Sequence, residues 1–229
     1  MRVSIERGPK GKKCVAYAID WPGLERNGKT VDTACERLDE YRQRYARVAT
    51  LAGLGQTFTA EPAAEIIEDY PGVGSTDFWG ISFAQSPLDL AGIDTETFER
   101  RILLLEACWQ EFDDIATRVS PELRKGPRGG GRDRDHIVRH LIASELDWTP
   151  KIGIRLDYHD VAFPVENRQQ FHEEVVAQLR YHYTTATPAR LKGGPEWSMP
   201  FFIRHLAYHV MDHAWEMEDK DLGEQDSTS

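Results

Sequence analysis

Two histidines lie four residues apart near the C-terminal end of the sequence, at His209 and His213. Residues at this spacing share one face of a helix, so both imidazoles can reach one metal ion from the same side. A third histidine, His140, lies in another segment with helical periodicity. Three neutral imidazoles leave coordination positions open, which is typical of catalytic zinc, nickel or iron sites. The sequence therefore predicts a divalent-metal site formed by His140, His209 and His213.

Such a metal supplies a nucleophile, because a water or thiol bound to it loses its proton near neutral pH. Three established metal motifs fit the sequence less well. Val210 follows His209, so the HExxH motif is absent, and Asp212 replaces the glutamate of the inverted HxxEH motif. A carboxylate-bridged di-iron site requires Glu-x-x-His pairs, and no histidine has a glutamate three residues before it. The sequence identifies no catalytic base.

Other residues flank the predicted ligands, and their roles stay open. Glu145 lies on the helical segment of His140, and Glu216 lies on that of His209 and His213. Each is a candidate to accept a hydrogen bond from a metal-bound imidazole, although glutamates are also common on solvated surfaces. His136 and His205 lie one turn before His140 and His209 and are further candidates to assist the site. The remaining histidines lack a paired partner and are expected to be structural or exposed; they are His159, His172 and His182.

The predicted ligands depend on four helical segments, at residues 94–119, 134–154, 167–183 and 198–220. In the last segment, Phe202, Leu206 and Val210 belong to an apolar stripe that also contains His213, with His209 at its edge. Residues 134–154 have a similar stripe, with His140 at its edge. Helices of this length joined by modest loops favour a four-helix bundle, in which the two histidine-bearing faces could meet, and the longer link after the second helix would also allow a crossover.

Residues 1–90 have a different pattern, in which short alternating strands surround a single helix. Strands are predicted around residues 3–5 and 15–19, with one or two further strands at residues 66–70 and 78–83, and Thr30 is a plausible N-cap for a helix that ends before Gly53. The predicted organisation is a small α+β domain at residues 1–90, followed by an all-α four-helix bundle at residues 91–229 whose last residues are disordered.

Charge and composition limit the classes of partner. The 229 residues include 28 Lys and Arg against 38 Asp and Glu, a net charge of −10, which argues against a general nucleic-acid binder without excluding a local basic patch. The longest aliphatic run has four residues, too short to cross a bilayer, and the N-terminus has no apolar signal region. Three scattered cysteines fit reduced thiols, as in the cytoplasm. Together these features predict a cytoplasmic protein without membrane partners.

The helical part resembles the DinB-like four-helix-bundle metalloenzymes. The resemblance rests on residues 140–145 and 205–213, because that family places one histidine on its second helix and an HxxxH motif near its end. It implies His140, His209 and His213 as ligands of zinc or nickel, with iron as a further candidate, and frequently a homodimer. Characterised relatives are thiol-dependent transferases and isomerases. The expected function is therefore metal-dependent S-transfer or hydrolysis of a small-molecule substrate, with a low-molecular-weight thiol as cosubstrate.

The first 90 residues resemble HicB-like antitoxin domains in residues 15–23 and 28–34, which contain a strand, a Pro-Gly turn and a Thr-capped helix. The bundle stands where that family usually carries a DNA-binding segment, so neither DNA binding nor toxin neutralisation is carried over. This domain is instead expected to act as a protein-contact module or as a regulatory module. The alternative function for the whole chain is accordingly a non-catalytic regulatory or protein-binding module fused to a metal-binding bundle.

Overall fold

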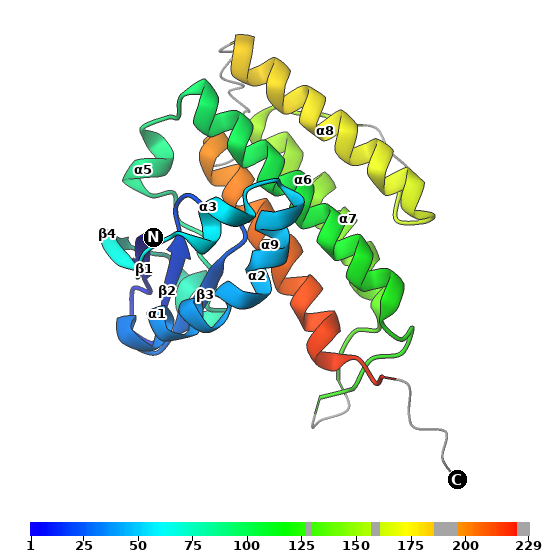
Figure 1. Ribbon diagram of the computed structural model, residues 1–229, viewed down its shortest axis with the longest axis horizontal. Helices are drawn as coiled ribbons and strands as arrows, with labels where there is room; N and C mark the ends of the chain where they lie inside the picture. Colours follow the sequence, from blue (N-terminus) through cyan, green and yellow to red (C-terminus); the bar gives the residue numbers. More distant parts are fainter. Residues whose placement is uncertain (127–129, 157–160, 186–196, 224–229) are drawn as a thin grey trace. The chain divides into compact units, whose positions relative to one another are not determined.

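The computed structural model describes residues 1–126, 130–156, 161–185 and 197–223 (Figure 1). Its strands are β1 Arg2–Arg7, β2 Cys14–Ala18, β3 Glu25–Gly28 and β4 Glu65–Pro71. The shorter helices are α1 Val31–Glu40, α2 Arg42–Leu51, α3 Gly55–Thr59, α4 Gly74–Phe78 and α5 Pro87–Leu90. The longer helices are α6 Thr95–Arg118, α7 Arg134–Trp148, α8 Val165–Thr185 and α9 Met199–Lys220. This order confirms the α+β class, with a small sheet at the start followed by long helices.

Backbone contacts divide the chain into two units. The first contains Met1–Cys108 and Ser198–Tyr208, and the second contains Trp109–Trp197 and His209–Ser229. Helices α6 and α9 therefore contribute residues to both units. The domain boundary at residue 90 remains a prediction, and each unit is described separately below.

The first unit is built on a four-stranded sheet with the order β3-β2-β1-β4. Strand β1 pairs antiparallel with β2 and parallel with β4, and α1 packs on β2 and β3 (Figure 1). Val3, Ile5 and Val15 are completely buried, as expected for strand residues that face a core. The Thr30 side chain accepts the backbone N–H of Thr33 and caps α1, as the sequence predicts.

The first unit differs from the sequence predictions in three places. Of the one or two strands expected at residues 66–70 and 78–83, only the first is present, as β4, and Phe78 instead ends the short helix α4. The buried Asp77 carboxylate explains this turn, because it accepts the backbone N–H groups of Lys10 and Lys12 at 2.6 and 2.8 Å and so ties α4 to the β1–β2 loop. The short polar strand β3 was not predicted. The expected single helix after Thr30 is two helices, α1 and α2, which meet at Tyr41.

A buried ion pair anchors the first half of α9 within the first unit. Arg204 is 3% exposed and donates to Asp89 Oδ2 at 2.7 Å and to Ser82 Oγ at 2.8 Å. Its guanidinium also lies 3.9 Å from the centre of the Tyr17 ring and 3.5 Å from a Glu25 oxygen. Burying an arginine is favourable only when its donors and charge are satisfied in this way.

The second unit contains α7, α8 and parts of α6 and α9. The helices predicted at 94–119, 167–183 and 198–220 are present with ends that differ by at most two residues. The helix predicted at 134–154 is shorter, because Pro150 cannot donate within an α-helix; α7 ends at Trp148, a 3₁₀ turn follows, and Gly153 (φ 86°) terminates it.

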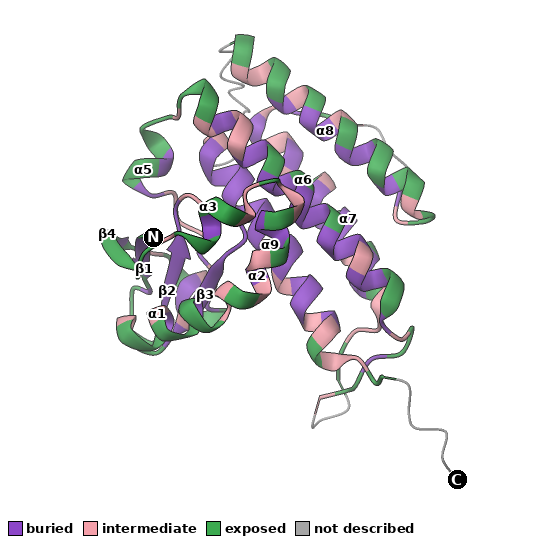
Figure 2. Cartoon of the chain, viewed as in Figure 1, coloured by how far each residue is buried: buried purple, intermediate pink, exposed green. Residues whose placement is uncertain are grey.

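Helix α8 illustrates how the helices of the second unit pack. Phe171, Val175 and Leu179 follow helical spacing and are buried, whereas the opposite face is exposed (Figure 2). Within the described residues, no helix combines the length and the apolar character needed to cross a membrane.

Candidate metal centre

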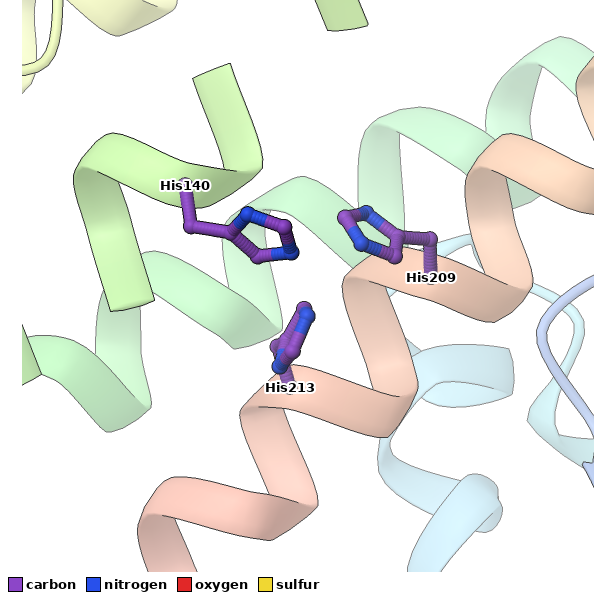
Figure 3. Close-up of side chains that lie close together, drawn as sticks. All are labelled: His140, His209 and His213. Atoms are coloured by element: carbon purple, nitrogen blue, oxygen red, sulfur yellow. The ribbon is translucent and has the colours of Figure 1, made fainter. Parts of the chain in front are cut away.

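The three predicted ligands lie together in the second unit. His209 and His213 project from consecutive turns of α9, and His140 projects toward them from α7 (Figure 3). The ring centres are 4.5 Å apart for the α9 pair, and the His140 ring lies 5.2 and 5.0 Å from them. One nitrogen from each ring can be chosen so that all three lie within 4.8 Å of one another. The sequence prediction therefore selected three side chains that the fold brings together.

The spacing and chemistry of these donors suit a transition-metal ion. A tetrahedral ion with bonds of 2.0–2.1 Å holds its nitrogen ligands about 3.3 Å apart, so the three nitrogens, now within 4.8 Å of one another, would have to move closer to bind it. Burial, followed by the positive charges of neighbouring groups such as His213, lowers the pKa of His140 to about 4. His140 is therefore neutral at pH 7, which is the form that binds metal.

Glu216 orients His213. The Glu216 carboxylate lies 2.8 Å from His213 Nδ1, and because a carboxylate only accepts, Nδ1 carries the proton and Nε2 keeps its lone pair for a metal. Lys220 Nζ donates to the other Glu216 oxygen at 2.5 Å. The His213 hydrogen bond is the main cause that lowers the pKa of Glu216 to about 2. Sequence spacing suggested Glu216 for this position; the contribution of Lys220 was not anticipated.

Glu145, the other candidate carboxylate, serves a different cluster. It is 1% exposed and accepts the Trp109 indole N–H at 2.8 Å, while His172 Nε2 lies 2.9 Å from its second oxygen. The Trp109 and His172 rings stack with centres 3.9 Å apart. Glu145 thus holds α7 to α6 and α8 and contributes no atom to the His140–His209–His213 cluster. The structural role expected for His172 is confirmed, and its partner is Glu145 rather than another histidine.

The remaining histidines also lie outside the cluster. His205 belongs to the first unit, where its Nδ1 lies 3.1 Å from the Ser82 carbonyl oxygen. His136 is exposed on α7, one turn before His140. His182 lies on α8 with its ring edge against Tyr181. His159 falls outside the described residues.

Trp148 borders the histidine cluster. Its ring meets that of His209 edge to face, with centres 4.8 Å apart, and the Trp197 ring lies 6.0 Å from it. The signal was in the sequence, because Trp148 follows His140 by eight residues and so lies close to the same face of α7. A large indole at this position shields one side of the His209 ring from water.

Comparison of the chain with protein-family models, curated proteins and solved structures finds no match. The functional assignment therefore depends on the side chains described above. Among the described residues, the His140–His209–His213 cluster is the one group of three or more metal-ligating side chains that could hold an ion.

Proposed function

We propose that the chain is a divalent-metal-dependent enzyme that binds its metal through His140, His209 and His213. The observation that carries the proposal is the convergence of three imidazole nitrogens within 4.8 Å from two helices. Zinc and nickel are the favoured ions and iron is a further candidate, because imidazole suits all three. As part of the proposal, residues 91–229 form a DinB-like four-helix bundle, and residues 1–90 form a HicB-like module that contacts a protein partner.

The residues support a catalytic rather than a structural site. Three protein ligands leave at least one position open for water or substrate, whereas structural zinc sites use four protein ligands. When bound, the metal would lower the pKa of a coordinated thiol or water and so supply a nucleophile at neutral pH. The protein's part is to hold His213 in one tautomer through Glu216 and to keep His140 neutral.

The proposed reaction is transfer or hydrolysis that uses a low-molecular-weight thiol and a small-molecule substrate. This choice follows from the resemblance at residues 140–145 and 205–213. We further propose a cytoplasmic, dimeric protein. Among the described residues, Cys14, Cys35 and Cys108 are not joined by disulfide bonds, which supports a reducing compartment.

The first test is the metal content of the purified full-length chain. After loading with Zn²⁺ or Ni²⁺ and removal of excess ion, the wild type should retain about one ion per chain. His209→Ala and His213→Ala should retain far less, whereas His182→Ala, which removes a histidine on α8 outside the cluster, should match the wild type. Equal metal content in all four proteins would remove the proposal.

A second test separates a catalytic from a closed site. Co²⁺ reports its coordination through visible absorption bands, so a small thiol added to the Co²⁺-loaded protein should change that spectrum if a position is open. An unchanged spectrum with saturating thiol would favour the alternative, a regulatory module with a closed metal site.

A further inference from the structure

A cavity of about 390 Å³ lies on another face of α7 within the second unit. Its wall opposite α7 is formed by Val161–Phe163. Six of the lining residues are apolar and one is a cation; they are Arg139, Ile142, Ala143, Leu146, Val161, Ala162 and Phe163. This cavity is open to solvent on one side, and its volume, its mainly apolar lining and its single charged group suit a small organic ligand.

The wall opposite α7 is held in place by the protein. The Ala162 carbonyl oxygen accepts from Arg168 Nη1 at 2.5 Å, and the Phe163 carbonyl oxygen accepts from Asn167 Nδ2 at 3.1 Å. Arg168 is in turn fixed by Asp113, which accepts from its Nε and Nη2 at 3.0 and 2.6 Å. The cavity is therefore already formed, and a ligand would not have to order this segment on binding.

The cation at the cavity defines which ligands fit. Arg139 is exposed, and its guanidinium lies 5.2 Å from the centre of the Phe163 ring. Within the described part of the chain, no carboxylate forms an ion pair with Arg139. Its planar donors are thus available at the edge of an apolar surface, an arrangement that suits a carboxylate with an apolar body.

We propose that this cavity binds a small amphipathic carboxylate, a medium-chain fatty acid or an aryl carboxylate. The carboxylate accepts hydrogen bonds from Arg139, and the apolar part packs against Ile142, Leu146 and Phe163. The histidine ligand His140 follows Arg139 in sequence but points to the α9 histidines, so this site is separate from the metal centre and does not depend on the proposed function.

Octanoate is a suitable probe, and its binding to the full-length protein can be followed by calorimetry or ligand-observed NMR. A ligand of about ten non-hydrogen atoms is expected to bind with a Kd on the order of millimolar. The matched probe n-octylammonium has the same chain with the opposite charge and should bind at least about tenfold more weakly. Absence of saturable octanoate binding, or equal binding of both probes, would overturn the proposal.

Two variants locate the binding. Arg139→Gln removes the charge and should raise the octanoate Kd about tenfold, the value of one charge-assisted contact. Ala143→Phe fills the cavity and should abolish binding. Both positions are exposed, so the variants should fold, which circular dichroism can verify. Lys29→Gln makes the same charge change on the first unit and should bind octanoate like the wild type. Unchanged affinity in Ala143→Phe would place octanoate elsewhere and refute the site.

Discussion

Helix α9 carries three histidines, each four residues from the next, and the first has different surroundings from the other two. His205 is 1% exposed in the first unit, stacked on Phe201 with Nδ1 against the Ser82 carbonyl oxygen. His209 and His213 belong to the second unit, where they face the imidazole of His140. The four-residue spacing from His205 to His209 is the same as that from His209 to His213. What differs is the neighbour: a backbone carbonyl and aromatic rings in one, a third imidazole in the other.

The comparison shows what helical spacing can and cannot decide. Spacing places side chains on one face, but the element that packs against that face determines whether a histidine is structural or a ligand. The predictions below test whether the two regions of α9 have these separate roles.

The largest expected effect is on folding of the first region. Arg204→Ala leaves Asp89 buried without its partner, so the free energy of unfolding should fall by about 3–5 kcal/mol in a denaturant titration. Arg118→Ala is the matched control, since Arg118 pairs with Glu218 near the surface, and should cost less than about 1 kcal/mol. Similar losses in both variants would contradict an anchoring role for Arg204.

The second effect concerns metal binding in the other region. His209→Ala or His213→Ala removes one of three ligands and should weaken Zn²⁺ binding at least about 100-fold, or about 2.7 kcal/mol, in competition with a chromophoric chelator. His205→Phe should keep the wild-type metal affinity. If His205→Phe weakened binding as much as His209→Ala did, the proposed separation of roles along α9 would fail.

A smaller effect is expected from the carboxylate that orients His213. Glu216→Ala should reduce metal affinity about 10- to 100-fold, and Glu216→Gln, which can still accept from Nδ1, should reduce it less. Glu218 lies on the same helix, and Glu218→Gln should leave the metal affinity unchanged. Wild-type affinity in Glu216→Ala would show that His213 needs no orienting partner.

The smallest effect is a pH dependence of stability from His205. Burial, aided by the charge of Arg204, lowers its pKa from 6.5 to about 3. Between these values the unfolded chain binds a proton that the folded chain does not, so His205 makes the protein less stable as pH falls from 6.5 toward 3. His205→Phe should make the free energy of unfolding less steeply dependent on pH in this window. An equal or steeper dependence would contradict the assignment.

The candidate site was more predictable from sequence than the small sheet. His209 and His213 share a helix face whatever the tertiary structure, and the amphipathic stripes of α7 and α9 constrain which faces meet. Strand β3, in contrast, contains Glu25 and Arg26, both buried, so alternation of apolar and polar residues could not reveal it. The α4 helix depends on a tertiary contact of Asp77, which local sequence does not encode.

Polar partners were the least predictable feature. Glu145 and Glu216 looked equivalent in sequence, since each lies on a helix that carries a predicted ligand. Only the packing of Trp109 and His172 against Glu145 distinguishes them. Helical spacing does identify i,i+3 and i,i+4 neighbours on one helix, which is why the Glu216 contact with His213 could be anticipated.

X-ray absorption of the Zn²⁺-loaded full-length protein tests the central claim most directly, because it reports the ligands of the ion itself. The proposed centre predicts three imidazole nitrogens at 2.0–2.1 Å. One further oxygen or nitrogen ligand would complete the shell, without sulfur. The same spectrum from His213→Ala should lose imidazole scattering. In thiol-free buffer, a shell that contains sulfur, or fewer than three imidazoles in the wild type, would contradict a metal centre at His140, His209 and His213.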